Sequence, residues 1–235
     1  MLIRLDKFLS DMSSLTRSQI KEAVKKGRVS VNGNVVKDSS LKISTTTDVV
    51  NLDKEEIKYN LFTYIIVNKP SGLVTSTSDD DGPNVMSILK GIPTKDLFPV
   101  GRLDKDTEGL LLITNDGELG HRLLSPKHHV PKTYYVECAK PLGDMELLML
   151  KDGVDIGDDK KTLPAKVKQV EDKTILLTIE EGRFHQVKRM LKAVNNSVLY
   201  LKRISFGNLS LDEQKLPKGS FKILDEDEIK ELKRF

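Results

Sequence analysis

Apolar positions near the start of the chain repeat with helical spacing in two places. One stripe lies within residues 5–9 and a second lies within residues 20–24. Thr16 or Ser18 is a candidate N-cap for the second helix, and Gly27 marks its end. This pattern predicts two short amphipathic helices, each with one buried face.

A β-hairpin is predicted directly after these helices. Residues 29–36 are rich in valine and surround an Asn32-Gly33 pair, which favours a tight turn between two strands. Residues 48–52 are expected to return as a further strand. The polar segment of residues 54–60 then indicates a linker.

The linker divides the chain near Tyr59 into a domain of residues 1–58 and a larger domain of residues 59–235. Strands are predicted to outnumber helices in the larger domain. The predicted strands cover residues 62–67, 110–113, 134–138, 165–170, 175–179 and 198–206, and the predicted helices cover residues 85–89, 117–125 and 185–194. Because strands and helices do not alternate regularly, the pattern favours an α+β fold with a mixed, mostly antiparallel sheet flanked by helices.

The composition is typical of a soluble protein with a full hydrophobic core. Hydrophobic residues occupy 38% of the 235 positions and charged residues occupy 31%. No apolar run reaches the ~18 residues of a membrane span, and the N-terminus lacks a signal-peptide pattern. The one cysteine, Cys138, cannot form an internal disulfide, and we expect it to be buried on a strand. These features predict a cytoplasmic protein with no membrane partner.

Positive charge is concentrated near the N-terminus. Residues 1–30 contain seven Lys and Arg against three Asp and Glu, whereas the whole chain has a net charge of only +3. Arg17, Lys21, Lys25 and Arg28 fall along one face of the second predicted helix. Charge patterning alone is explained by a solvated helix face. A basic module attached to a nearly neutral body nevertheless indicates a polyanion as partner.

Several common kinds of site are missing from the sequence. It contains no glycine-rich phosphate loop, no dinucleotide-binding fingerprint and no serine nucleophile elbow. The four histidines and one cysteine lack metal-ligand spacing, so we predict no metal site. The acidic segment Asp79–Asp81 fails the spacing of a calcium loop and is predicted to be a solvated loop. His128 and His129 are expected in a polar loop, which leaves contact with a ligand open.

What remains is a carboxylate among cations. Arg102 and Asp104 stand two positions apart, so an extended chain would direct both side chains into one site. Tyr134 and Tyr135 are neighbours on a predicted strand and therefore face opposite ways. Residues 182–190 place basic and polar groups at the start of a predicted helix. Singly, each feature has an ordinary structural explanation, such as a tyrosine packed in the core.

The N-terminal part resembles a known RNA-binding module. Residues 4–9, 16–20 and 27–33 match the pattern of the S4-like (alpha-L) RNA-binding domain, first known from a small-subunit ribosomal protein. The resemblance implies a small α/β domain over residues 1–58 whose basic stripe contacts RNA phosphates. The positions that match this role are Arg4, Arg17, Ser18, Lys21, Lys25 and Arg28.

The rest of the chain resembles the pseudouridine synthases. The segments that carry the resemblance are Gly-Arg-Leu-Asp at 101–104, Lys-Thr-Tyr at 132–134, and residues 182–190. Residues 120–134 are more similar to the bacterial group that modifies small-subunit (16S) ribosomal RNA than to its large-subunit relatives. The resemblance implies an isomerase that converts one specific uridine, of the uridine-516 type, to pseudouridine by base flipping and without a cofactor.

The resemblance also implies roles for individual residues. Asp104 matches the catalytic nucleophile, and Arg102 matches the arginine that helps to flip the uridine and interacts with its phosphate. Tyr134 matches the tyrosine that stacks on the base and serves in proton transfer. Lys188 matches the cation that pairs with the aspartate, although the neighbouring Arg189 is an alternative for this position. Further RNA contacts are implied for Arg183, His185 and Arg189.

The implied partner is 16S ribosomal RNA or a small-subunit assembly intermediate, and the protein is expected to act as a monomer. Two alternatives stay open at this point. One is a 23S ribosomal RNA pseudouridine synthase of the same family. The other is a non-catalytic RNA-binding or ribosome-assembly factor on the same scaffold, which would have no reason to keep Arg102, Asp104, Tyr134 and Lys188 together.

Overall fold

The computed structural model describes residues 1–78, 80 and 82–235 of the chain. The predicted acidic loop therefore lies partly outside the described residues, because Asp79 and Asp81 are not among them. Within the described part of the chain, no helix combines the length and the apolar character needed to cross a lipid bilayer.

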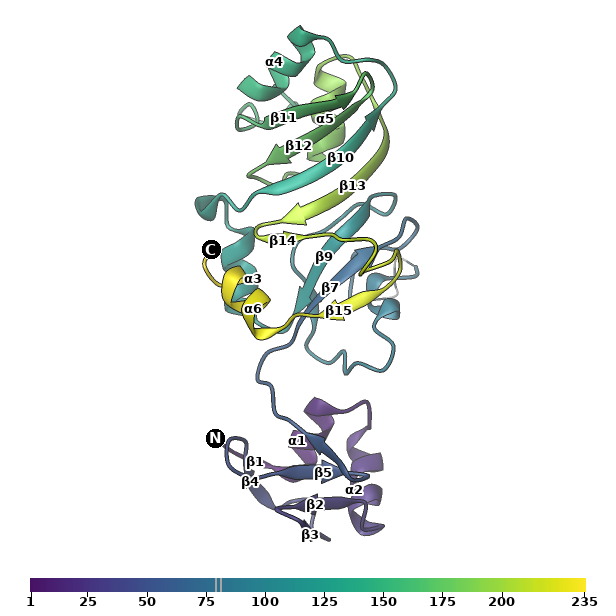
Figure 1. Cartoon of the computed structure of the whole chain (residues 1–235), viewed down its shortest axis with the longest axis vertical. Coiled ribbons are helices and arrows are strands. Elements are labelled where there is room, and N and C mark those ends of the chain that lie inside the picture. Colours follow the sequence, from purple (N-terminus) through teal and green to yellow (C-terminus); the bar gives the residue numbers. More distant parts are fainter. Residues whose placement is uncertain (79, 81) are drawn as a thin grey trace. The chain divides into compact units, whose positions relative to one another are not determined.

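The described residues form two compact units. The first unit consists of residues 1–62 and 89–96, and the second consists of residues 63–88 and 97–235. Figure 1 shows the sheets and helices of each unit. The domain boundary that the sequence predicts between residues 58 and 59 stays a prediction.

Two helices and two small sheets make up the first unit. Strands β1 and β4 pair antiparallel, and the other four strands form a sheet in the order β3-β2-β5-β6. The bounds are β1 (Leu2–Arg4), α1 (Leu5–Met12), α2 (Arg17–Lys25), β2 (Val29–Val31), β3 (Asn34–Val35), β4 (Lys42–Ser44), β5 (Val50–Leu52) and β6 (Glu55–Ile57). The apolar faces of both helices and the inner strands share one core, which includes Phe8, Ile20 and Val29.

The predicted cap and hairpin of this unit are confirmed. Thr16 is the N-cap of α2, because its Oγ1 accepts a hydrogen bond from the backbone N–H of Gln19 at 3.3 Å. The Gln19 side chain in turn accepts from the N–H of Thr16 at 2.8 Å, which completes a capping box. Asn32 and Gly33 adopt φ values of 51° and 80°, as an Asn-Gly hairpin turn requires.

A single mixed sheet organises the second unit. Within the described residues its main order is β11-β12-β10-β13-β9-β7-β15, with β14 paired to β13 and β8 paired to β9. The bounds are β7 (Tyr64–Lys69), β8 (Phe98–Pro99), β9 (Glu108–Thr114), β10 (Lys132–Cys138), β11 (Lys166–Glu171), β12 (Thr174–Ile179), β13 (Val198–Phe206), β14 (Leu209–Ser210) and β15 (Phe221–Ile223). Strands β9 and β13 run parallel and the other pairs given for this sheet are antiparallel, so the predicted α+β fold is confirmed.

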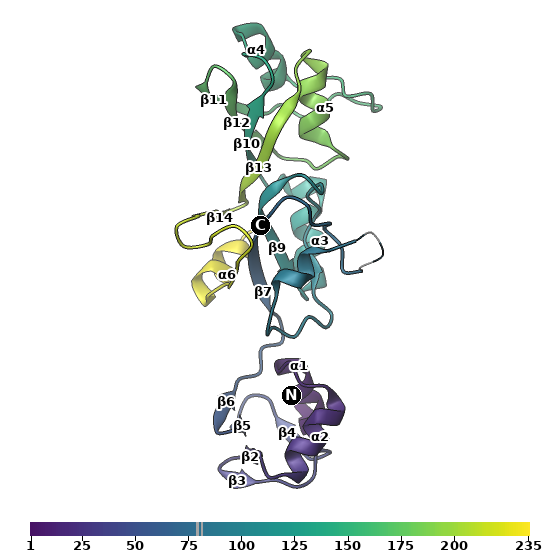
Figure 2. The ribbon, with the colours of Figure 1, turned by 90° about the vertical axis from the view of Figure 1, so that its right-hand side faces the viewer.

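Helices pack against this sheet and fix the segments that lead to its strands. Their bounds are η1 (Val85–Ile88), α3 (Gly117–Leu124), η2 (Pro126–His128), α4 (Asp144–Asp152), α5 (Gln186–Ala193) and α6 (Glu226–Leu232), where η marks a 3₁₀ turn. Leu119 and Leu123 of α3 share a core with Leu232 of α6 and with Leu110 and Leu112 of β9. Figure 2 shows α5 running beside β13.

The parallel contact between β9 and β13 is unusually close at Gly109. The backbone of Gly109 has a φ of 103°, and a Cβ built there would lie 2.2 Å from the carbonyl oxygen of Arg203. Arg203 is itself buried, and its Nε donates to the carbonyl of Leu110 at 2.8 Å. Only glycine tolerates both the conformation and the approach at this point. The loop of residues 101–107, which precedes β9, is therefore anchored at the centre of the sheet.

Most differences between expectation and structure concern the ends of elements and two helices that the sequence pattern did not predict. The short helix expected at residues 85–89 is a 3₁₀ turn, η1. Helix α4 was not predicted because Leu147, Leu148, Met149 and Leu150 are consecutive, so no apolar periodicity is visible there. Leu147 and Leu150 are buried while Leu148 and Met149 are exposed, which gives the helix a narrow apolar face. Helix α6, the other omission, lies within the acidic C-terminal segment.

Candidate active site

Lys69 holds the loop that carries Asp104. It lies at the end of β7, is fully buried, and its ammonium group points at backbone carbonyl groups. The Nζ atom donates to the carbonyl oxygens of Asp104 at 3.1 Å, Lys105 at 3.2 Å and Thr107 at 2.8 Å, and to that of Pro70 at 3.2 Å. Burial lowers the pKa of Lys69 to about 8, while the nearby carboxylates act in the opposite direction.

A second contact fixes the same loop from the segment after β7. The Oγ1 of the buried Thr75 donates to the carbonyl of Leu103 at 2.7 Å and accepts from the N–H of Leu103 at 3.2 Å. The N–H of Gly72 donates to the carbonyl of Lys105 at 2.8 Å. The backbone on both sides of Asp104 is therefore fixed by hydrogen bonds before any ligand binds.

The Asp104 carboxylate lies between two groups from the start of α5. Its Oδ2 is 3.2 Å from Nζ of Lys188, and its Oδ1 is 3.4 Å from Nε2 of His185. Lys188 also contacts both carboxylate oxygens of Asp106, at 2.6 and 2.8 Å. The Asp104 side chain is 26% exposed, so it is accessible while a cation stays beside it.

Charge sharing in this cluster changes the pKa values of its outer members. The hydrogen bond from Lys188 lowers the pKa of Asp106, even though partial burial acts in the opposite direction. Burial by itself would lower the pKa of Lys188, but the hydrogen bonds to Asp106 and Asp104 outweigh this and raise it. Lys188 is therefore a permanent cation at neutral pH.

The choice between Lys188 and Arg189 is resolved by this geometry, because Arg189 points elsewhere. Its guanidinium donates to the carbonyl of Ile156 through Nε at 3.0 Å and to the carbonyl of Phe184 at 3.1 Å, and it pairs with Asp158. Arg189 therefore connects the start of α5 to the 156–158 loop, and Lys188 is the cation at Asp104.

Arg183 is likewise engaged within the protein. Its guanidinium donates to the carbonyl oxygens of Lys160 at 2.6 Å and Lys161 at 2.8 Å, and it pairs with Glu181 at 2.9 Å. These contacts hold the residues before α5 in place. The RNA contacts predicted for Arg183, His185 and Arg189 stay predictions.

These groups line a cavity of about 600 Å³. Asp104, Arg102 and Tyr134 all border it, as the sequence predicts for residues of one site. Tyr134 is mostly buried on β10, whereas Tyr135, on the other face of the sheet, packs edge-to-face with Tyr200 at 6.2 Å. Arg102 is exposed, and its guanidinium has no hydrogen-bond or ion-pair partner among the described residues. A free cation, a carboxylate and an aromatic ring thus border the same cavity.

Lys132 is a further member of the cavity for which the sequence suggested no role. It is buried, its Nζ donates to the carbonyl of Val130 at 2.8 Å, and it lies 5.5 Å from the ring centroid of Phe206. Burial, together with the neighbouring Arg203, lowers the pKa of Lys132 to about 8. The signal that could have found it is its place two positions before Tyr134 on the same strand.

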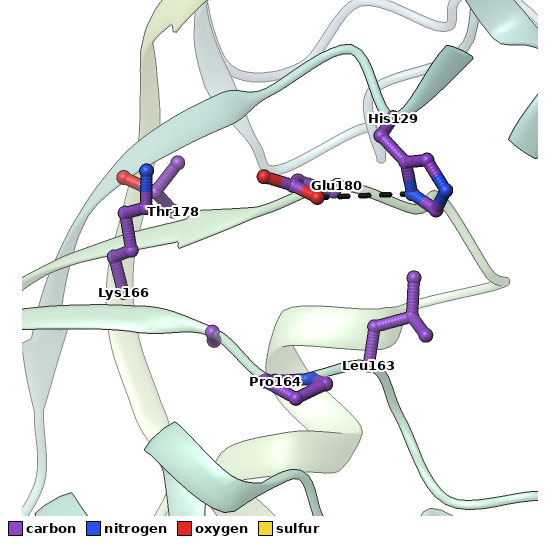
Figure 3. Close-up of a pocket in the computed structure, with 7 residues that line it drawn as sticks. His129, Leu163, Pro164, Lys166, Thr178 and Glu180 are labelled. Carbon is purple, nitrogen blue, oxygen red and sulfur yellow. Dashed lines mark ion pairs between the residues drawn. The ribbon is translucent and has the colours of Figure 1, made fainter. Parts of the chain in front are cut away.

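A second, smaller hollow of about 340 Å³ lies where β11 begins and β12 ends, and Figure 3 shows it in close-up. His129 and Glu180 lie at one end, with the Nδ1 of His129 3.7 Å from Oε2 of Glu180. Leu163 and Pro164 form part of its wall. Glu180 borders this hollow while its neighbour Ile179 borders the Asp104 cavity, so the two hollows are on opposite sides of this strand end.

The predicted RNA-binding residues of the first unit are on its surface. The six side chains, all exposed, are Arg4, Arg17, Ser18, Lys21, Lys25 and Arg28. Arg4 pairs with Asp6 at 2.8 Å, and Arg28 pairs with Asp53. Within the described residues, the side chains of Arg17, Lys21 and Lys25 form no ion pair, so three cations of the predicted stripe are available to a polyanion.

The side chains of the described residues include no group of three or more His, Cys, Asp or Glu placed to hold a metal ion. Cys138 is buried on β10, as expected, and burial raises the pKa of its thiol to about 11. A neutral thiol of this kind is a packing residue.

Comparison with known proteins gives the class of this protein, an RNA-modifying isomerase with an RNA-binding domain. Residues 63–193 match the model of the RNA pseudouridylate synthase family, and residues 3–50 match the S4 domain model. The chain therefore belongs to the RNA pseudouridylate synthase family and carries an S4 domain.

Similar proteins extend over the full length of the chain. An uncharacterized RNA pseudouridine synthase of Bacillus subtilis is 43% identical over 97% of this chain and 97% of its own length. A ribosomal small subunit pseudouridine synthase A of Haemophilus influenzae is 39% identical over 98% of this chain and 99% of its own. A crystal structure of a pseudouridylate synthase matches with a TM-score of 0.69 and 39% identity, covering 98% of this chain and 99% of that one.

Proposed function

We propose that this protein converts one uridine of small-subunit ribosomal RNA to pseudouridine, with Asp104 as the nucleophile. The observation that carries the proposal is the Asp104 carboxylate, which lies 3.2 Å from the Lys188 ammonium in a cavity also bordered by Arg102 and Tyr134. Several full-length relatives at 37–40% identity are ribosomal small subunit pseudouridine synthases A. That name supports a small-subunit target over a 23S target, and a uridine of the uridine-516 type stays a prediction.

The chemistry requires a carboxylate that is ionised next to the sugar. Isomerisation breaks the bond between N1 of uracil and C1′ of ribose, turns the base, and forms a bond between C5 and C1′. On one route Asp104 attacks C1′ as the N1–C1′ bond breaks, and it leaves C1′ when the C5–C1′ bond forms. On the other route Asp104 takes the C2′ proton as the N1–C1′ bond breaks, which gives a glycal, and it returns that proton when the C5–C1′ bond forms. The Lys188 ammonium, 3.2 Å from Oδ2, places a positive charge beside Asp104. The proton on C5 is lost and N1 gains a proton, so no oxidant or cofactor enters the balance.

The target base must leave its stack to reach Asp104. Flipping a base out of a helix costs a few kcal/mol. Stacking on the Tyr134 ring offsets about 1–3 kcal/mol of this cost, and the ring hydroxyl is suited to carry the C5 proton. Arg102 supplies an unpaired guanidinium for the phosphate of the flipped nucleotide. The unpaired cations of the first unit, Arg17 and Lys21 among them, would bind the RNA backbone elsewhere.

The proposal is tested with RNA labelled with tritium at C5 of uridine, because pseudouridine formation releases this tritium to water. The wild-type protein is incubated with 16S RNA, with a small-subunit assembly intermediate and with 23S RNA, and the modified position is then mapped. We expect release from a small-subunit substrate at one uridine and none with Asp104→Asn, which keeps the side-chain volume and still binds RNA. Release from 23S RNA alone would identify the large-subunit alternative, and no release from any RNA would support a binding factor.

A further inference from the structure

Phe184 is an aromatic side chain at the Asp104 cavity for which the proposed chemistry has no role. It is 75% exposed, which makes it the most exposed large apolar side chain among the described residues, and it borders the cavity. A solitary exposed apolar residue on a surface requires no explanation. An aromatic ring at the rim of a cavity that takes a nucleoside is different, since stacking on such rings binds bases.

The inner face of the Phe184 ring is already covered by His185. The two rings are stacked with centroids 3.8 Å apart and planes 20° apart. His185 in turn contacts Asp104, with Nε2 3.4 Å from Oδ1. Carboxylate, imidazole and phenyl ring therefore form a continuous series that begins at the nucleophile and ends at solvent. The outer face of Phe184 is the end of this series and has the geometry of a stacking surface.

The backbone of this segment is fixed on both sides of the ring. The N–H of Arg183 donates to Oε1 of Gln186 at 2.9 Å, and the carbonyl of Phe184 accepts from Arg189 at 3.1 Å. His185 has a φ of 48°, a conformation that a non-glycine residue adopts only where its surroundings hold it. Phe184 is thus presented to solvent by a rigid support, so a base that stacks on it would order little of the protein.

We propose that the outer face of Phe184 is a stacking platform for the unpaired nucleobase next to the target uridine. This inference rests on the function proposed above. The target base lies against Tyr134 and Asp104 inside the cavity, and a base on the outer face of Phe184 is separated from Asp104 by the imidazole of His185. It must therefore belong to a neighbouring nucleotide. The exposed cations Arg102 and Lys105 border the same cavity and suit the connecting phosphates.

A phenyl ring offers no hydrogen-bonding group, so this platform would bind an RNA with any base at the flanking position more tightly than an RNA that lacks a base there. It would raise the affinity for RNA whose flanking nucleotide is unpaired without selecting the identity of that nucleotide. The arginines of this segment, Arg183 and Arg189, serve the platform indirectly by holding its backbone.

The test compares Phe184→Ala, Phe184→Leu and Phe184→Tyr in the full-length protein. We expect kcat/KM for pseudouridine formation to fall about tenfold in the alanine and leucine variants, the size of one lost base stack, and to be retained in the tyrosine variant. Leu199→Ala is the matched control, because Leu199 is 70% exposed on β13 and does not border the cavity. It should have wild-type activity.

A second measurement identifies the partner of the ring. With the wild-type protein, an abasic nucleotide on one side of the target should lower kcat/KM by the same factor of about ten. With Phe184→Ala, the abasic nucleotide should cause no further fall in kcat/KM. If the losses caused by Phe184→Ala and by the abasic nucleotide simply add, or if Phe184→Ala has wild-type activity, the stacking proposal is wrong. Either result leaves the proposed synthase function untouched. Should the wild type form no pseudouridine, the proposed function fails by itself, and the same cycle measured as RNA affinity on the Asp104→Asn background still decides whether Phe184 stacks.

Discussion

Lys132 is a buried ammonium group that makes the stability of the protein depend on pH. Its pKa is about 8 in the folded state because burial, and then Arg203, disfavour its charge, against an ordinary value of 10.5. Below pH 8 both the folded and the unfolded chain hold the proton, and the full cost of burying the charge is present. Between pH 8 and 10.5 the folded state releases the proton first, so the contribution of Lys132 to stability rises with pH.

The substitution Lys132→Met tests this effect, because methionine has a similar volume and no charge. Between pH 7 and pH 10, we expect the unfolding free energy of the wild type to rise by about 2 kcal/mol relative to that of the variant. Denaturant unfolding of both proteins across this range measures the difference, in which the shared contribution of Lys69 cancels. A difference that does not change with pH would mean that Lys132 is charged in the folded state throughout.

At the residue scale, the sequence was sufficient for some members of the site and not for others. Asp104 and Tyr134 stand in short motifs, so they were identified from the sequence and do border one cavity. Lys69 could not be found in this way, because the carbonyl groups it binds in the 104–107 loop come from residues 35 to 38 positions further along the chain. The contact of His185 with Asp104 was also hidden, since it depends on the left-handed backbone of His185.

At the scale of elements, the approach of β9 to β13 at Gly109 allows a direct test. We expect Gly109→Ala to lower the unfolding free energy by about 3 kcal/mol or more, because a Cβ would both strain a φ of 103° and press on the Arg203 backbone. Thermal unfolding should show the loss, as a fall in melting temperature of about 5–10 °C.

Gly157→Ala is the control for the strain alone. Gly157 has a φ of 81° and has no atom within 4 Å of the position where a Cβ would lie. Its substitution should therefore cost only about 1 kcal/mol. Equal losses in the two variants would show that the close approach of β13 contributes nothing to the effect at Gly109.

Strand and helix positions were predictable where a segment is rich in apolar and β-branched residues or has one apolar helix face. β13 has the bounds predicted for it, residues 198–206, and α5 lies within one residue of its expected ends. Helix α4 escaped prediction because its four central apolar residues are consecutive. The order of the strands in the sheet was beyond the sequence, since it depends on pairings such as that of β9 with β13, whose residues lie about 90 positions apart.

At the scale of the whole molecule, three exposed cations of the first unit give RNA binding a measurable salt dependence. Replacing Arg17, Lys21 and Lys25 by glutamine removes the stripe cations that form no ion pair within the described residues. We expect weaker RNA binding and a slope of log affinity against log salt that is shallower by about 2–3. The reason is that binding with fewer phosphate contacts releases fewer counterions.

The matched control replaces three exposed lysines of the second unit, Lys151, Lys168 and Lys173, none of which borders the Asp104 cavity. RNA affinity titrations from low to high salt compare the two triple variants with the wild type. A slope unchanged by the substitutions in the first unit would remove the basic stripe from the RNA-binding surface. An equal fall in RNA affinity and in slope for both variants would mean that the effect comes from the total charge of the protein and not from the basic stripe.

The contacts of the Lys69 ammonium determine which positions of the 104–107 loop tolerate substitution. It recognises backbone oxygens of the loop at Asp104, Lys105 and Thr107, and a backbone oxygen is the same whichever amino acid carries it. The side chain of Lys105 is exposed at the rim of the cavity and does not take part in the contacts by which Lys69 holds the loop. A substitution at position 105 would therefore change the charge at the rim of the cavity and leave the backbone contacts that hold the nucleophile in place.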